Sequence, residues 1–234
     1  MLFLIHGWAS GSAVWPQWLR ENAYCYQSVQ FPDGKELEET FCKNFFEQEE
    51  KITIAGWSLG GMLALELAAA HPDKVEKLIL FSSTPRFLQD AVYYGGLPSS
   101  VVKNLNRKLL RNQWDTQQAF YRMMFAENEK SWELEFIETL APCFSGLSLG
   151  ELQGGLDYLM KRDLRDLLPG IRVPCLIIHG SEDQICLPEA AVYLENHLPQ
   201  AYLTMLSGAG HIPFLTQQSK VREIVREWER EIGT

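Results

Sequence analysis

The pattern that most constrains this chain is a G-x-S-x-G pentapeptide, Gly56 to Gly60, with Ser58 at its centre. It follows an apolar run typical of a buried strand, 51–55, and precedes an alanine- and leucine-rich run typical of a helix, 62–70. A serine at a sharp strand-to-helix turn is held in a strained backbone conformation that exposes its hydroxyl. Glycines are needed beside it because a side chain there would collide with the neighbouring strand or helix. We therefore predict that Ser58 is a nucleophile.

A serine nucleophile needs a base and a carboxylate, and candidates for both follow later in the chain. Asp183 comes after the strand-like run 173–178, and His211 comes after the strand-like run 201–206. In an open parallel sheet, sites form where the carboxyl ends of the strands lie. The order serine, acid, histidine is one in which this catalytic set occurs. We predict that His211 acts as general base and then acid, and that Asp183 orients its imidazole.

Other residues could compete for these roles. Glu182 adjoins Asp183 and is the alternative carboxylate. His71 and His197 lie near predicted helix ends, where a histidine is typically solvated. His179 lies in a strand and is interpreted as a packed histidine of the core or its rim. We interpret these histidines as structural.

The apolar strand 2–5 leads directly into His6, Gly7 and Trp8. Backbone N–H groups stabilise the negative oxygen that develops when a nucleophile attacks an ester. In enzymes built on a G-x-S-x-G turn, one such group follows the nucleophile and another comes from an early strand-to-helix loop. We therefore predict that the N–H groups of Trp8 and Leu59 form the oxyanion hole. His6 is expected to brace the loop.

Strand-like and helix-like segments alternate from residue 1 to about residue 83 and again after residue 169, which predicts a parallel sheet. Between them, residues 85–168 show helical periodicity with many aromatic side chains, which predicts a cap over the site. We expect an α/β-hydrolase fold: a mostly parallel sheet flanked by helices, with core segments 1–84 and 169–234 and an inserted all-helical cap, 85–168. Strands are expected at 2–5, 26–30, 51–55, 77–82, 173–178 and 201–206, and core helices at 16–22, 36–47, 59–70, 188–197 and 216–231.

Composition excludes several classes of function. The net charge of −9 argues against a nucleic-acid partner. Five cysteines without pairing or metal-binding spacing are expected to be reduced thiols. Because nucleotide-binding and zinc-protease motifs are missing, we expect no cofactor and no metal. No apolar run reaches the roughly 18 residues of a membrane span, and no signal-peptide pattern is seen, so we expect a cytoplasmic monomer.

The cap segment carries an unusual local charge. Lys103, Arg107 and Arg111 recur every four residues and therefore share one face of a helix, with Lys108 beside them. Residues 98–130 hold six basic and three acidic side chains, a local charge of +3 in a chain of −9. This face is either simply solvated or a docking surface for an acidic partner, whose attraction would weaken as salt rises.

Several of these motifs together resemble one family. The chain is similar, over nearly its whole length, to the pimeloyl-[acyl-carrier protein] methyl ester esterases of biotin synthesis, the BioH type. The resemblance lies in His6-Gly7-Trp8 with Val14-Trp15, Gly56-Trp57-Ser58-Leu59-Gly60-Gly61, Ser82-Ser83-Thr84-Pro85, Asp163-Leu164-Arg165, Asp183 after Gly180, and Gly210-His211 with Pro213-Phe214.

The resemblance implies a serine carboxylesterase that removes the methyl ester of a pimeloyl chain carried on acyl carrier protein. It favours Asp183 over Glu182 and implies a triad of Ser58, Asp183 and His211. It also implies ester contacts from Trp8 and Leu59, acyl-chain contacts from Phe120, Tyr121, Arg122, Met123 and Met124, and carrier docking by Lys103, Arg107 and Arg111.

Two departures from the family pattern leave the substrate open. The family's usual β-hairpin before the first strand is missing, and the segment 120–124 is bulkier and more charged than the family leads us to expect. The alternatives are a general small-molecule carboxylesterase or thioesterase, or a lyase of the menaquinone-pathway type on the same triad. A ligand-binding receptor of the same fold is an alternative of a different class.

Overall fold

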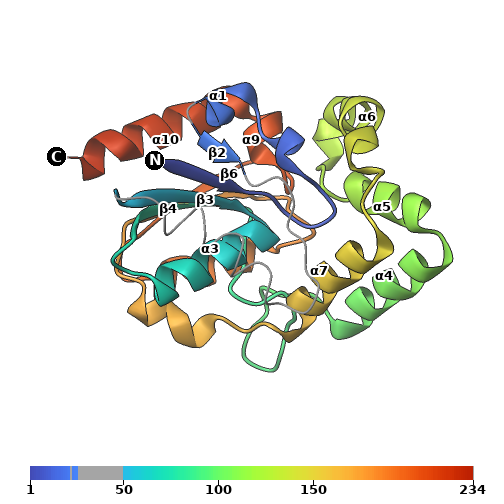
Figure 1. Ribbon diagram of the computed structural model, residues 1–234, viewed down its shortest axis with the longest axis horizontal. Coiled ribbons are helices and arrows are strands. Elements are labelled where there is room, and N and C mark those ends of the chain that lie inside the picture. Colours follow the sequence, from blue (N-terminus) through green and yellow to red (C-terminus); the bar gives the residue numbers. More distant parts are fainter. Residues whose placement is uncertain (22, 26–49, 234) are drawn as a thin grey trace.

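The computed structural model describes residues 1–21, 23–25 and 50–233. The described strands form one six-stranded sheet in the order β2-β1-β3-β4-β5-β6, with every neighbouring pair parallel (Figure 1). Because all strands run the same way, their carboxyl ends meet at one edge of the sheet. The strands are β1 (Leu2–Ile5), β2 (Ala23–Cys25), β3 (Ile52–Trp57), β4 (Val75–Phe81), β5 (Cys175–Gly180) and β6 (Ala201–Leu206).

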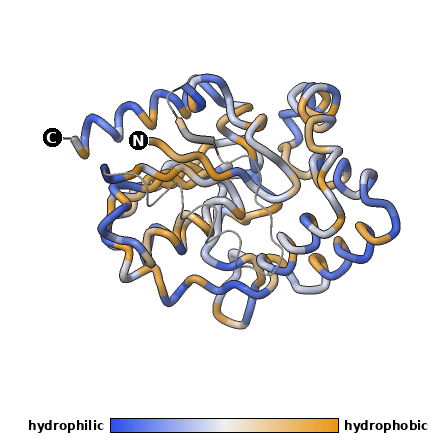
Figure 2. The backbone as a smooth tube through the Cα atoms, in the orientation of Figure 1, coloured by the Kyte–Doolittle hydropathy of each residue, from blue (hydrophilic) through white to orange (hydrophobic). Residues whose placement is uncertain are grey.

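The central strands are apolar on both faces, as a parallel sheet covered by helices requires. Ile54, Leu78 and Ile177, from β3, β4 and β5, are completely buried. Figure 2 shows these strands as the most hydrophobic part of the backbone. Burying one such side chain stabilises the fold by about 1.5–3 kcal/mol relative to leaving it exposed. The core therefore lies around the sheet and holds its carboxyl edge in place.

Helices cover both faces of the sheet. Figure 1 shows α3 (Leu59–Ala70) on one face and α1 (Gln17–Arg20) with α10 (Gln218–Ile232) on the other. In α10, Val221, Val225 and Trp228 recur at helical spacing and are buried, while the rest of the helix is mostly charged. The remaining core elements are η1 (Ser12–Val14), α8 (Pro188–His197) and α9 (Pro213–Thr216).

A helical cap is inserted between β4 and β5 and lies beside the carboxyl edge of the sheet (Figure 1). Its two connections to the sheet pass side by side. The Leu164 N–H donates to the Pro85 carbonyl (2.9 Å), and Arg86 forms an ion pair with Asp163 (2.6 Å). The cap elements are α4 (Ser99–Arg111), α5 (Gln113–Arg122), η2 (Glu127–Glu129), α6 (Lys130–Thr139), η3 (Ala141–Phe144), α7 (Leu149–Lys161) and η4 (Arg165–Gly170).

The predicted fold class, a parallel sheet flanked by helices, is confirmed, although element ends differ. β5 begins at Cys175 rather than residue 173, since Pro174 lacks the N–H that a sheet ladder uses. The predicted last helix, 216–231, is α10, which begins at Gln218, and the short helix α9 before it was not predicted. The strand expected at 26–30 and the helix expected at 36–47 lie outside the described residues. None of the described helices combines the length and apolar character needed to cross a bilayer.

Candidate active site

Ser58 lies at the turn between β3 and α3 with φ 56° and ψ −120°. A non-glycine residue at positive φ costs on the order of 1–3 kcal/mol and persists where its surroundings hold it. The Ser58 N–H donates to the Phe81 carbonyl (2.9 Å), and the Ser83 hydroxyl donates to the Ser58 carbonyl (2.8 Å). A Cβ at Gly60 would collide with the Ile5 carbonyl, so the turn requires glycine there. These contacts fix Ser58 at the carboxyl edge of the sheet.

Asp183 and His211 are brought together from the loops that follow β5 and β6. Nδ1 of His211 lies 2.8 Å from Oδ2 of Asp183, and both side chains are buried. Because a carboxylate only accepts hydrogen bonds, Nδ1 is the donor, and the neutral ring therefore carries its lone pair on Nε2. In the described part of the chain Nε2 has no hydrogen-bond partner. This tautomer is the one that a general base requires.

The carboxylate of Asp183 is held in its charged form. Oδ1 accepts from the N–H groups of Ile185 (2.9 Å) and Cys186 (3.0 Å), and His179 Nε2 lies 3.3 Å from Oδ2. Burial acts to raise the pKa of Asp183, but the charge and hydrogen bonds of His211 and His179 outweigh it and hold the pKa well below its usual value. Asp183 is therefore an ionised acceptor at neutral pH.

The backbone of residues 207–212, the loop that carries His211, is hydrogen-bonded both to the cap and to Trp57, which precedes Ser58. The His211 N–H donates to the Met124 carbonyl (2.7 Å), and the Gly210 N–H donates to Glu129 (2.9 Å). On the other side, the Trp57 indole donates to the His211 carbonyl (2.9 Å). The position of the imidazole thus depends on residues from the cap and from β3.

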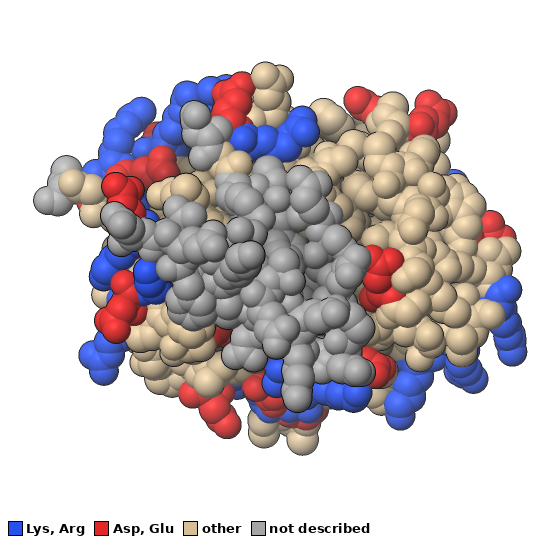
Figure 3. Space-filling view, in the orientation of Figure 1, with Lys and Arg blue, Asp and Glu red and all other residues tan. Residues whose placement is uncertain are grey.

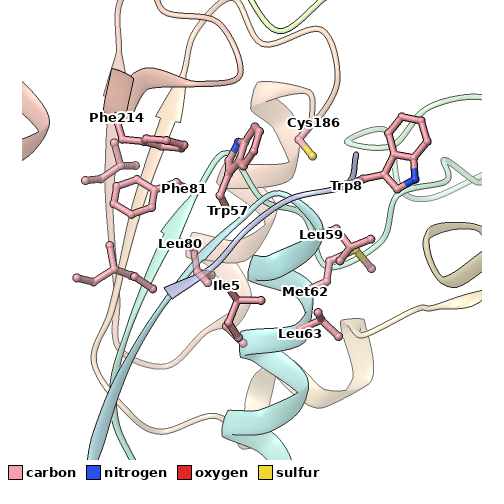
Figure 4. Close-up of a cluster of buried hydrophobic side chains, with 14 of the residues drawn as sticks. Ile5, Trp8, Trp57, Leu59, Met62, Leu63, Leu80, Phe81, Cys186 and Phe214 are labelled. Atoms are coloured by element: carbon pink, nitrogen blue, oxygen red, sulfur yellow. The ribbon is translucent and has the colours of Figure 1, made fainter. Parts of the chain in front are cut away.

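Within the described part of the chain, no hydrogen bond joins Ser58 to His211. Burial raises the pKa of the Cys186 thiol well above its usual value, the charge of Asp183 adds to the effect, and the Ser58 hydroxyl opposes it. Figure 4 shows Cys186 between Trp57 and Trp8. In substrate-free sites, catalytic hydrogen bonds are often long and tighten when substrate binds.

The loop after β1, residues 6–10, holds the peptide between Gly7 and Trp8 in a fixed orientation. The Gly7 carbonyl accepts from Nδ1 of His6 (2.9 Å) and from the Ser10 hydroxyl (2.9 Å). Because a trans peptide is planar, fixing this carbonyl directs the Trp8 N–H to the opposite side. Within the described residues, neither this N–H nor that of Leu59 has a hydrogen-bond acceptor. Burial lowers the pKa of His6 to about 4, so its ring is neutral at physiological pH.

Three of the five residues in the segment 120–124 lie against the site. The Phe120 ring meets the Trp8 indole edge-on, with 4.6 Å between centroids. Tyr121 and Met124 are completely buried, and the carbonyl of Met124 is the one that holds the histidine loop. The segment therefore packs between residues 6–10, which form the predicted oxyanion loop, and residues 207–212, the loop that carries His211.

The other two residues of that segment face away from the site. Arg122 forms an ion pair with Glu133 on α6 (3.0 Å), and Met123 is 43% exposed. An acyl chain in the site would therefore reach Phe120 before either of them, and the structure does not bring Arg122 or Met123 together with Ser58.

A cavity lies between the oxyanion loop and α7. The loop residues from His6 to Ser10 form one wall, and Leu59, Leu147, Leu152 and Gly155 form most of the rest. Its lining is largely apolar, with Glu151 at its border. The cavity touches Trp8 and Leu59, but its volume of about 20 Å³ leaves room for roughly one water molecule.

The predicted basic face lies on α4, on the outside of the cap. Lys103, Arg107, Lys108 and Arg111 are all exposed. Among the described residues none of them forms an ion pair, whereas most other cap cations do. Figure 3 shows Lys and Arg side chains along the edge of the molecule that α4 occupies. This surface is separate from the buried site.

Two residues near Asp183 were missed by sequence reasoning. His179 had been interpreted as a packing residue, yet its Nε2 donates to the Cys186 carbonyl (2.7 Å) and approaches Asp183. Its place near the carboxyl end of β5 was the available signal, since functional side chains gather at that edge. Cys186, whose N–H donates to Asp183 (3.0 Å), gave no signal, because no sequence motif marks this cysteine. In the described ranges no cluster of side chains is arranged to bind a metal.

The fold and the site together define a hydrolase of the α/β-hydrolase type. The chain belongs to the α/β-hydrolase fold family, whose model matches residues 48–218. A solved esterase from Exiguobacterium antarcticum superposes with a TM-score of 0.80 at 23% identity. The superposition covers 98% of this chain and 91% of the esterase chain. A bromoperoxidase from Bacillus anthracis superposes with a TM-score of 0.85 at 18% identity and the same coverage. At these identities the two structures establish the fold alone.

Among curated proteins, the chain is similar to the pimeloyl-[acyl-carrier protein] methyl ester esterase of Nitrosospira multiformis. The two are 30% identical over 96% of this chain and 93% of the relative. A protein of the same name from Legionella pneumophila is also 30% identical, over 92% of this chain and 89% of the relative. The similarity extends across both halves of the core and the cap.

Proposed function

We propose that this chain is a serine carboxylesterase that hydrolyses the methyl ester of a pimeloyl chain carried on acyl carrier protein. The names of its relatives at 30% identity support this substrate. The single observation that carries the chemistry is the hydrogen bond from His211 Nδ1 to Asp183, which leaves Nε2 free as a base.

The reaction follows from the positions of these groups. His211 accepts the proton of Ser58 as the serine oxygen attacks the ester carbonyl. The N–H groups of Trp8 and Leu59 donate to the oxyanion, and Asp183 stabilises the imidazolium. Methanol leaves with the proton from His211. Water then attacks the acyl-enzyme by the same route and releases the carboxylate.

The site walls suggest how the acyl chain is held. Phe120 and the apolar cavity beside the oxyanion loop lie next to the two donor N–H groups. Apolar side chains such as these suit the methylene chain of a pimeloyl group, although the cavity as it stands, about 20 Å³, holds only a water-sized group. Tyr121, Met124, Arg122 and Met123 belong to the same segment and stay predicted acyl contacts, the last two from a more outward position.

The basic face of α4 is proposed as the docking surface for the carrier. Lys103, Arg107 and Arg111 are exposed on one face of the helix, and within the described residues no carboxylate neutralises them. Attraction between this face and an acidic carrier would accelerate association and would weaken as salt screens it.

The first test compares the carrier-bound methyl ester with the free dimethyl ester of pimelate. We expect kcat/KM to be higher for the carrier-bound ester by at least about 10-fold at low salt, a preference that shrinks as ionic strength rises. Steady-state kinetics at several salt concentrations measure it. Equal turnover of both esters at all salt concentrations would contradict the carrier assignment and would favour the general carboxylesterase.

A further inference from the structure

The oxyanion loop contains a strained residue beside its donor N–H. Ala9, which follows Trp8, has φ 55°, a left-handed conformation that favours glycine. Such a conformation is kept where surrounding contacts over-determine it. The contacts that hold Ala9 therefore decide where the Trp8 N–H points.

One of those contacts comes from the cap. The Tyr121 hydroxyl on α5 donates to the Ala9 carbonyl at 2.6 Å, across 112 positions of sequence. The same hydroxyl accepts from the Gln117 amide (3.3 Å). Tyr121 and Gln117 are both completely buried. Burial raises the pKa of Tyr121, so the phenol stays a protonated donor.

The peptide between Gly7 and Trp8 is held by hydrogen bonds within residues 6–10. The Gly7 carbonyl is fixed by His6 and Ser10, as described above, and the Trp8 indole donates to the Leu152 carbonyl on α7 (2.8 Å). The carbonyls of Gly7 and Ala9 thus have fixed partners on both sides of Trp8. The Trp8 N–H between them has little freedom to turn.

We propose that Tyr121 is a positioning residue for the oxyanion hole: its hydroxyl holds the strained Ala9 and thereby aims the Trp8 N–H at the developing oxyanion. This inference rests on the proposed esterase function. It assigns the Tyr121 hydroxyl a role through the oxyanion loop, separate from the predicted contact of the Tyr121 side chain with the acyl chain. It also couples the cap to catalysis, because α5 carries both this tyrosine and Phe120.

The test is Tyr121→Phe. Phenylalanine keeps the ring and its edge-on contact with Phe136 (5.5 Å between centroids) but removes the hydroxyl. The matched control is Tyr158→Phe, which removes another buried cap tyrosine hydroxyl, bonded to Glu66 on α3 at 2.7 Å rather than to the oxyanion loop. Melting temperatures of both variants show how much each loses in stability.

The primary measurement is kcat and KM for p-nitrophenyl butyrate. We expect Tyr121→Phe to lower kcat by at least about 10-fold with KM changed less than about 2-fold, because a misaimed donor weakens binding of the transition state. Tyr158→Phe should keep kcat within about 2-fold of the wild type, since it leaves the loop intact. A Tyr121→Phe kcat equal to the wild-type value, or an equal loss in both variants, would overturn the proposal.

A second readout separates this inference from the esterase proposal. A fluorophosphonate probe reacts with an activated serine and places its phosphoryl oxygen in the oxyanion hole, whatever the natural substrate. Its labelling rate at Ser58 should fall in Tyr121→Phe by a factor similar to kcat, and not in Tyr158→Phe. If the wild type hydrolyses no ester but is labelled, the esterase proposal fails while the labelling rates still decide the role of Tyr121. An unlabelled wild type would refute both.

Discussion

At the scale of single residues, burial has opposite consequences around Ser58. Among the described residues His6 has no charged neighbour that would compensate for its burial, so burial lowers its pKa to about 4 and keeps it neutral. Asp183 is buried as deeply, but His211 and His179 surround it and keep it charged. Burial also keeps the thiol of Cys186 protonated. The partners that each group finds, rather than depth alone, therefore set the charges in the site.

The shifted pKa of His6 predicts how stability depends on pH. The unfolded chain binds a proton at His6 near pH 6.5, whereas the folded chain does so only near pH 4. Between these values the unfolded state holds more protons, so the free energy of unfolding falls as pH is lowered, by up to about 3 kcal/mol from this residue. Urea denaturation between pH 7 and pH 4.5 measures the slope.

His6→Asn provides the comparison, because asparagine does not titrate and its amide can still donate to the Gly7 carbonyl. The variant should lose stability less steeply over the same pH range. Asp183 contributes little to the slope between pH 7 and pH 4.5, because the stability that comes from its lowered pKa is lost mainly below pH 4. Identical slopes for wild type and variant would show that His6 is not the group responsible.

At the scale of elements, the cap helices have separate tasks. α5 and α7 hold the oxyanion loop, through Tyr121 on Ala9 and through the Leu152 carbonyl on Trp8. α4 packs against both of these helices and carries the basic face on its outer side. A carrier bound to α4 would therefore rest on the helices that position the oxyanion hole.

The basic face makes a prediction of its own. Arg107→Glu on α4 should raise KM for the carrier-bound ester by about 5- to 10-fold at low salt, because it reverses one charge in the docking surface. It should leave hydrolysis of the free ester unchanged. Arg222→Glu on α10 is the matched control, an exposed arginine on a helix away from the cap (Figure 1). A similar KM for both variants would argue that α4 is merely a solvated face.

At the scale of the whole molecule, the site joins the ends of β3, β5 and β6 with a cap inserted between β4 and β5. The sequence allowed the fold class and the Ser58 turn to be predicted, because a strand, a glycine-bracketed serine and a helix are adjacent in the chain. The pairing of Asp183 with His211 could be expected from chain order. The contact of Tyr121 with Ala9 could not, since nothing local in the sequence specifies which distant groups packing brings together.

The central claim is that Ser58 is the nucleophile of an ester hydrolase. Its most direct test is kcat/KM of Ser58→Ala with methyl pimeloyl-acyl carrier protein, beside a melting temperature to show that the fold is retained. We predict a loss of at least about 10,000-fold with little change in stability, because removing the nucleophile leaves only oxyanion stabilisation and binding. Hydrolysis by a folded Ser58→Ala variant at a rate near that of the wild type would contradict the account.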